Sequence, residues 1–294
     1  PTALLAEARR ARAIPENSER DPEQALARRE QRDAVGEFAR QKGYRSQREL
    51  AQELLAWKVL RATLAENQLA EVATDFWFDH FTVSSVDPET RAYLLAYERD
   101  AIRPHVFGRF RDLLGAVARH PAMLLYLDNA RSTAEANAPT AARGALRGFE
   151  GGGRVGRGQG RARGGGVGGF GGGSMRGGGA RTPTRRRGEG LNENFARELL
   201  ELHTLGVDSG YTQEDVVAVA RAFTGWTVLP PHAGPEIDRW IDLAWTRLPE
   251  RGEFLFRPDT HDAATKVVLG KKLASGRGLE DGEEVLDLLA AHPK

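Results

Sequence analysis

Apolar side chains recur every three to four residues between positions 46 and 81, and they form two stripes. The stripes consist of Leu50, Leu54, Trp57, Leu60 and Leu64, then Leu69, Val72, Phe76 and His80. A repeat near 3.6 residues predicts amphipathic helices rather than strands. Pro88 suits the first turn of a further helix, and Pro104 should end or kink that helix before the pattern resumes at Phe110.

Helical spacing returns in the second half of the chain. We expect a helix over residues 192–205 with Gly206 just past its end, and Thr212 with Asp215 as a variant capping box at the start of another. A last helix is expected over residues 280–291. The helical period is lost between residues 226 and 256, where the segments 240–241 and 254–256 predict a short β-hairpin. The fold class is therefore mainly α: a single helical domain with a small β-hairpin region.

Glycine and charge divide this domain. Residues 144–190 hold 21 of the 34 glycines and ten arginines against two glutamates, which gives this segment +8 of a total of +1 and leaves −7 elsewhere. So many glycines cannot bury enough apolar surface to offset the backbone entropy lost on folding. We predict a disordered Gly/Arg-rich insertion here.

The chain is accordingly divided into four parts. Residues 1–45 form a charged N-terminal arm, residues 46–143 the first part of the helical core, residues 144–190 the insertion, and residues 191–294 the remainder of the core. Because the chain begins at Pro1 and stops just after a helical pattern, we expect it to be a fragment, truncated at its C terminus.

The insertion contains GxGxxG spacings, for example at Gly164, Gly166 and Gly169. A dinucleotide fingerprint needs a strand before it and a helix after it, and neither is predicted, so glycine density explains the match. Arg–Gly repeats can also bind phosphate without sequence preference. Weak contact with nucleic acid or an acidic surface therefore stays open, although a flexible linker is the commoner role of such a segment.

The absence of cysteine excludes disulfide scaffolds, thiolate zinc sites, iron–sulfur clusters and thiol nucleophiles. No apolar run approaches the roughly 18 residues that span a bilayer. The chain also has no GxSxG, HExxH, GxxxxGK[ST] or EF-hand motif. No common enzyme class is indicated by a motif.

Several longer motifs carry a family resemblance. They are FWFDHF at residues 76–81, IRPH at 102–105, PAMLLYLDN at 121–129, and LNENFARELLELHTLGVDSGYTQEDVVAVARAFTGW at 191–226. Together they resemble the bacterial family called domain of unknown function 1800, and His261, Asp262 and Lys266 resemble its following motif. The resemblance extends from about Leu50 to the end of the chain, apart from the insertion.

The resemblance implies little about chemistry, because the family has no settled activity. Its members are typically longer, often look exported, and are often encoded beside a second uncharacterised family of sulfatase-like appearance. It therefore implies an exported or envelope-associated protein, although no export signal is visible in this chain. Asp79 stands where similar proteins usually have Asn.

The helix expected at 192–205 supplies the candidate chemistry. At 100° per residue, Asn194, Arg197, Glu198 and Glu201 share a face, and two carboxylates at i and i+3 can hold one cation. Such sites are completed by side chains from facing helices. The full candidate polar site consists of Asn194, Arg197, Glu198, Glu201, His203, Asp79, His80, Arg103, His105, His261 and Asp262. Within it, Glu198, Glu201 and His80 are the expected ligands of a divalent metal, the one cofactor that the sequence leaves open.

A structural interpretation competes with each of these assignments. Arg197 can pair with Glu201, while Arg103 or Arg221 neutralises Glu198 in a buried network. His203 lies about 140° from Glu198 around the helix and should not share its ion. His80 continues an apolar stripe, which favours a hydrogen-bonded core histidine.

The two remaining histidines have local alternatives. His105 follows Pro104 and can satisfy the backbone at a kink or act as a general base. His261 and Asp262 are expected at a helix start, where Asp262 would favour the helix dipole.

Three functions follow, in order of preference. The first is a non-catalytic binding or assembly protein of unknown partner. The second is a metal-dependent hydrolase or oxidase with a Glu/His site on facing helices. The third is nucleic-acid binding through the Arg/Gly insertion.

Overall fold

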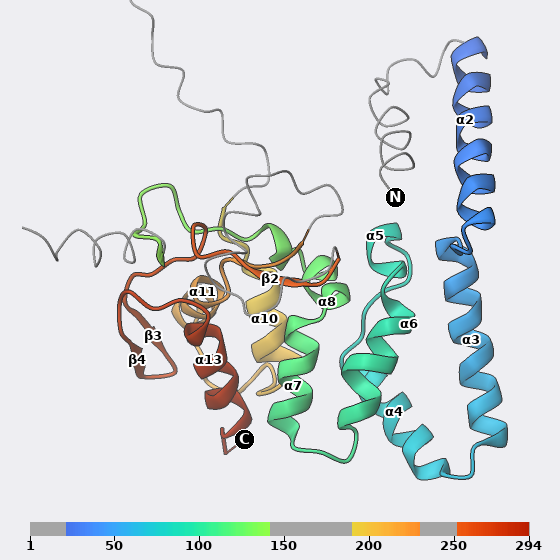
Figure 1. Ribbon diagram of the computed structural model, residues 1–294. Helices are drawn as coiled ribbons and strands as arrows, with labels where there is room; N and C mark the ends of the chain where they lie inside the picture. Colours follow the sequence, from blue (N-terminus) through green and yellow to red (C-terminus); the bar gives the residue numbers. More distant parts are fainter. Residues whose placement is uncertain (1–21, 142–189, 230–251, 294) are drawn as a thin grey trace, which may run out of the picture.

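Three helices form one edge of the molecule in the computed structural model, which describes residues 22–141, 190–229 and 252–293 (Figure 1). Helices α2 (Pro22–Gln41) and α3 (Gln47–Leu64) follow one another along this edge, and α4 (Gln68–His80) turns back against α3. The Ser46 hydroxyl accepts from the Glu49 amide while the Glu49 carboxylate accepts from the Ser46 amide, so a capping box starts α3. Helix α2 covers most of residues 22–45, the described part of the N-terminal arm.

The chain next enters a series of short turns. These are α5 (Pro88–Arg91), α6 (Leu94–Ala96), the π-helical η2 (Tyr97–Ile102) and the 3₁₀ turn η3 (Arg103–His105), followed by α7 (Phe110–Arg119), α8 (Pro121–Tyr126) and the 3₁₀ turn η4 (Asn129–Arg131). The break expected at Pro104 is confirmed, because its ring removes a backbone donor and the helix changes its hydrogen-bond pattern there.

The second half supplies α10 (Asn194–Glu201), α11 (Gln213–Ala222) and α13 (Glu280–Ala290). The helix expected over 192–205 is shorter than predicted. After Glu201 the amides of His203 and Leu205 bond five residues back, so the turn widens before Gly206 takes a φ of 91°. The capping box of Thr212 and Asp215 and the last helix are confirmed.

Two separate two-stranded antiparallel sheets lie beside these helices. Strand β1 (Trp226–Val228) pairs with β2 (Phe254–Phe256), and β3 (Lys266–Val268) pairs with β4 (Lys271–Leu273). The strand at 254–256 is as expected, but its partner is β1, and residues 240–241 lie outside the described part. The β3–β4 hairpin was not predicted, because its turn places Leu269 at a φ of 49°, a conformation that this residue type rarely signals.

The core forms where α10, α11, β1 and α13 meet beside α7 and α8 (Figure 1). A chain of edge-to-face aromatic contacts runs through it from Phe195 to Phe223, Trp226 and Phe254, with ring centroids 4.8–5.2 Å apart. Such pairs stabilise a core beyond the area that they bury. The mainly α fold is therefore organised around the segment that joins α11 to β1.

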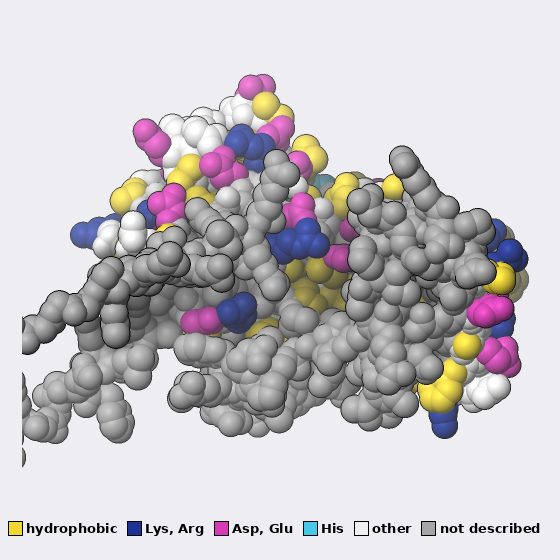
Figure 2. Space-filling view, turned by 90° about the horizontal axis from the view of Figure 1, so that it is seen from above, with side chains coloured by type: hydrophobic (Ala, Val, Ile, Leu, Met, Phe, Trp, Pro, Cys, Tyr) yellow, Lys and Arg dark blue, Asp and Glu magenta, His cyan; other side chains and the backbone are white. Residues whose placement is uncertain are grey.

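Helices α3 and α4 are confirmed, but both apolar stripes are largely exposed, and on α3 this holds for Trp57, Leu60 and Leu64. Leu54 is buried, whereas Leu69, Val72 and Phe76 are 67%, 65% and 60% exposed. Helix α4 instead buries Thr74 and turns the stripe to solvent. In the space-filling view, acidic and basic side chains mingle with hydrophobic ones wherever grey atoms do not cover the surface (Figure 2).

No helix within the described ranges is long and apolar enough to cross a membrane. The predicted disordered insertion at 144–190 lies outside the described residues except for Gly190, so the nucleic-acid hypothesis that depends on it stays a prediction.

Candidate functional site

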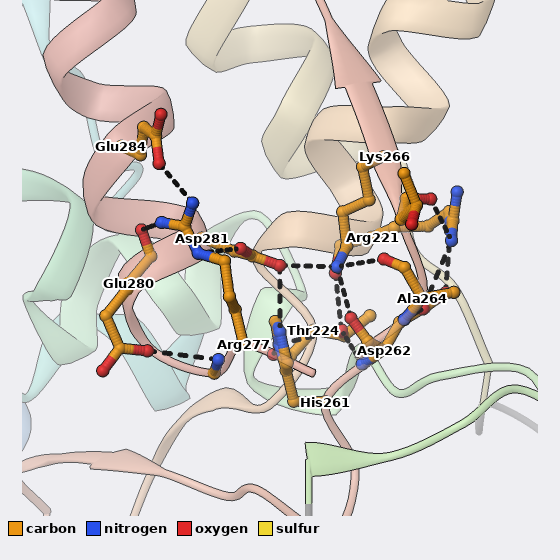
Figure 3. A network of polar contacts seen from close by, with 12 residues as sticks. Arg221, Thr224, His261, Asp262, Ala264, Lys266, Arg277, Glu280, Asp281 and Glu284 are labelled. Atoms are coloured by element: carbon orange, nitrogen blue, oxygen red, sulfur yellow. Dashed lines mark hydrogen bonds and ion pairs between the residues drawn. The ribbon is translucent and has the colours of Figure 1, made fainter. Parts of the chain in front are cut away.

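A buried polar network joins α11, the segment before β3, and the start of α13 (Figure 3). At its centre, the Asp281 carboxylate accepts a hydrogen bond from Lys266 Nζ at 2.6 Å and lies 3.0 Å from Arg277 Nε. The side chains of Lys266 and Asp281 are completely buried. Removal of Asp281 would take the ion-pair partner from the buried Lys266, and removal of Lys266 would leave the buried Asp281 with Arg277 as its remaining close cation, so either loss is costly in a medium of low dielectric.

Protonation follows from this packing. Burial favours the neutral acid, yet the contacts to His261 and Lys266 outweigh it and keep the pKa of Asp281 below its ordinary value. Burial lowers the pKa of Lys266, and the hydrogen bond to Asp281 opposes that shift. Lys266 Nζ also donates to the carbonyls of Asp262 and Ala264, which completes the three donors of an ammonium group.

Thr224, His261 and Asp281 occur in the order of a hydroxyl, an imidazole and a carboxylate. Thr224 Oγ1 lies 3.4 Å from His261 Nδ1, and His261 Nε2 lies 3.5 Å from Asp281 Oδ2. However, the Thr224 hydroxyl already donates to the Arg221 carbonyl and accepts from the Asp262 amide, while His261 Nδ1 donates to the Thr224 carbonyl. All three side chains are buried from solvent, unlike the reacting hydroxyl of a catalytic triad, which must meet its substrate.

Asp262 pairs with Arg221, whose Nε donates to Oδ2 at 2.7 Å. The expectation of a helix start at His261 and Asp262 is wrong. These residues occupy an irregular segment between β2 and β3, where the Asp262 carboxylate accepts from the Ala264 amide and so begins a tight turn. Burial opposes ionisation of this carboxyl, but Arg221 holds its pKa below the ordinary value.

The predicted polar face of α10 is present, with different partners. Arg197 pairs with Glu193 at 3.2 Å and with Gln213 at 3.0 Å rather than with Glu201, and Asn194 is exposed at the first turn. Neither Arg103 nor Arg221 reaches Glu198, because each is bound to other carboxylates. Burial, followed by the charge of Glu201, raises the pKa of Glu198.

His80 lies against His203, in contact with its backbone. His80 Nε2 is 3.1 Å from the His203 carbonyl, and the ring stacks on Phe76. Burial and the nearby His80 lower the pKa of His203 to about 4. His80 is hydrogen-bonded as expected, but it is half-buried rather than in the core. Asp79 is exposed, and the half-buried His105 closes its turn through its carbonyl.

The structure does not gather the expected metal ligands. Within the described ranges, no group of three or more His, Asp or Glu side chains is placed to hold an ion, and this includes Glu198, Glu201 and His80. The metal hypothesis stays a prediction that elemental analysis can test.

A second ion network surrounds Arg103, far along the chain from the first. Its guanidinium donates to both Glu71 oxygens at 2.7 and 3.0 Å and to Glu98 Oε1 at 2.8 Å. Lys58 donates to Asp75 at 2.6 Å beside it. These side chains line a groove of about 410 Å³ between α3 and α4, with Val59 and Val72 also along its wall.

A family model described as protein of unknown function (DUF1800) matches residues 2–294. The chain belongs to the DUF1800 family. The match is wider than the resemblance, which began near Leu50 and omitted the insertion. No curated protein and no solved structure gave a match to the chain. Family membership therefore establishes relationship and leaves the activity to be argued from the site.

In this DUF1800 chain, the motifs behind the resemblance meet in space. Asn129, from the LDN motif, is fully buried and donates to the carbonyls of Phe223 and Trp226, in the FTGW motif, at 3.1 and 3.0 Å. Sequence reasoning missed Asp281, Glu71 and Glu98. Only the tertiary contacts single them out, since acidic residues within helices usually face solvent.

Proposed function

We propose that this chain is a non-catalytic binding or assembly protein that docks a helix of another protein on the outer face of α3 and α4. The supporting observation is the exposed stripe of Leu69, Val72 and Phe76 on α4. Their i, i+3, i+7 spacing makes one continuous line along the helix. Amphipathic helices dock on such lines through their own apolar faces.

Helix α3 extends this apolar surface. Leu55 and Val59 are exposed on the side of α3 where Val59 lines the groove beside α4. At 100° per residue the other exposed large side chains, Trp57, Leu60 and Leu64, lie on the opposite side of the helix. Together the two helices carry eight of the fifteen large hydrophobic side chains that are exposed in the described residues. Leu55 and Val59 join Leu69, Val72 and Phe76 on the groove side, and at about 100 Å² each these five side chains present on the order of 500 Å², which is at the small end for one side of a protein interface. This concentration distinguishes α3 and α4 from a surface with scattered apolar residues.

The assignment as non-catalytic follows from access. The hydroxyl, imidazole and carboxylate groups that could act together are buried and engaged around Asp281, whereas the exposed faces of α3 and α4 carry large apolar side chains beside charged ones. A docking role requires no reacting group, only a shaped apolar face and a polar rim.

The test uses an 18-residue amphipathic peptide of Leu, Ala and Gln, titrated into the full chain while amide chemical shifts are followed. We expect shifts on α3 and α4, and at least about tenfold weaker binding to the triple variant Leu69→Gln/Val72→Gln/Phe76→Gln. The matched control is Leu202→Gln/Val207→Gln, because these side chains are similarly exposed, at 58% and 65%, but lie elsewhere. The proposal fails if the parent does not bind, or if the control loses as much affinity.

A further inference from the structure

The groove between α3 and α4 contains an acidic oxygen without a hydrogen-bond donor. Arg103 engages Glu98 through Oε1 alone, and Glu98 Oε2 has no hydrogen-bond partner although the side chain is only 8% exposed. Lys58 Nζ lies 3.6 Å from this oxygen, beyond hydrogen-bonding distance. A buried carboxylate oxygen in this condition costs free energy that a donor would recover.

Lys58 is held away from that oxygen by Asp75. Its ammonium donates to Asp75 Oδ1 at 2.6 Å and lies 4.2 Å from the centre of the Phe78 ring. The Asp75 side chain is 65% exposed, so a group arriving from solvent can reach it. A competing cation on Asp75 would free Lys58, which needs to move by less than about 1 Å to donate to Glu98.

The charge around the groove indicates which kind of partner would bring that cation. Residues 47–80 carry three basic side chains against six acidic ones, although the whole chain has a formal charge of +1. The groove itself is lined by Glu71, Asp75 and Glu98 against Lys58 and Arg103. A basic partner is thus favoured over an acidic one. It is also favoured over a second copy of this chain, whose own α3 and α4 would bring the same acidic charge.

We propose that the docked helix is basic and places a lysine or arginine side chain on Asp75, which releases Lys58 to Glu98 Oε2. The aliphatic stem of that side chain would lie between Val59 and Val72 at the groove, and the rest of the helix would cover the stripe of Leu69 and Phe76. This inference rests on the proposed docking function and names the chemistry of its partner.

The test compares two versions of the 18-residue peptide that differ at one central position of the apolar face, lysine in one and glutamate in the other. Binding to the full chain is measured by fluorescence anisotropy at about 0.15 M salt, where distant charges are largely screened. We expect the lysine peptide to bind about tenfold more tightly. Asp75→Asn should reduce the ratio of the two affinities at least threefold, because it removes the carboxylate that pairs directly with the lysine of the peptide.

Asp79→Asn is the matched control, since Asp79 carries the same charge on the same helix, is exposed, and does not line the groove. It should leave the ratio unchanged. Equal effects of the two variants, or equal binding of the two peptides, overturn the inference and leave the docking function in place. If neither these peptides nor the uncharged one binds, the docking function itself is wrong. Self-association in sedimentation velocity that excludes the peptides assigns the face to a second copy and also overturns the inference.

Discussion

Lys266 Nζ and Asp281 Oδ2 lie 2.6 Å apart, and neither side chain is exposed to solvent. The pair fastens β3 to the first turn of α13, fifteen residues later in the chain. Because both charges are inside the protein, each one mainly offsets the cost of burying the other. Removal of one charge should therefore destabilise the fold more than replacement of both by apolar side chains.

Replacement of one partner should therefore be more harmful than replacement of both. We expect Lys266→Met to lower the free energy of unfolding by about 3 kcal/mol, because Asp281 loses its closest cation. Lys266→Met/Asp281→Leu should lose less than the sum of the single variants. Urea denaturation of the four proteins of this cycle measures the coupling, and additive losses would contradict mutual compensation.

Gly282 lies where α13 crosses Trp226. A Cβ atom at this position would come within 2.5 Å of Trp226 Cζ2, inside a buried contact. We expect Gly282→Ala to destabilise the fold by about 1–3 kcal/mol through overpacking. Gly36→Ala in α2 is the matched control, since nothing lies within 4 Å of the added atom, and it should stabilise by about 0.5–1 kcal/mol. Thermal unfolding distinguishes the two, and equal shifts would be inconsistent with this packing.

His120 and His203 should make stability depend on pH. Burial is the main cause that lowers the pKa of each to about 4 from 6.5. The unfolded chain therefore binds protons first, so stability is complete above about pH 6.5, falls as the pH drops towards 4, and then levels off for these two groups. Each should cost about 1 kcal/mol over the first pH unit below 6.5.

Equilibrium unfolding at several pH values between 7 and 4 measures this slope. His120→Asn should flatten part of it, and the amide oxygen can still accept from the Ala122 amide as His120 Nδ1 does in the parent. His203→Gln should remove the part of the pH dependence that is due to His203. A slope that both variants retain would show that other groups cause the pH dependence.

The Asn129 side chain should not tolerate a substitution that removes its amide donor. Its amide nitrogen donates to two carbonyl oxygens, of Phe223 and Trp226, inside the core. Asn129→Asp replaces that donor with an acceptor and faces a carboxylate with two carbonyls, so we expect a loss of more than about 3 kcal/mol. The loss should shrink at low pH, where the acid is neutral and can donate. A pH-independent loss in urea unfolding would refute this reason.

Glu198 and Glu201 offer the test of the metal hypothesis. Repulsion between them contributes to the raised pKa of Glu198, so Glu198→Gln should stabilise the metal-free protein by a few tenths of a kcal/mol at neutral pH. If the pair binds a divalent ion, that ion should raise the Tm of the parent but not of Glu198→Ala/Glu201→Ala. Elemental analysis of protein purified without chelator provides the second readout, and a parent free of metal would discard this site.

The sequence by itself determined the local structure. Periodicity placed α3, α4, α11 and α13, Pro104 marked the break after η2, and Thr212 with Asp215 marked the start of α11. These features depend on side chains and backbone within a few residues of one another, which is why a linear pattern reveals them. The family motifs were likewise legible without coordinates, and the family match confirmed them.

Tertiary structure decided which way each pattern faces and which charges meet. The stripe of Leu69, Val72 and Phe76 has the same spacing whether it faces the core or solvent, and only the packing of α4 through Thr74, Trp77 and Phe78 settles its direction. Lys266 and Asp281 are fifteen residues apart, and Arg103 and Glu71 are thirty-two. Their pairing depends on loop closure and burial, which no local spacing encodes, because long-range ion pairs follow from the fold rather than direct it.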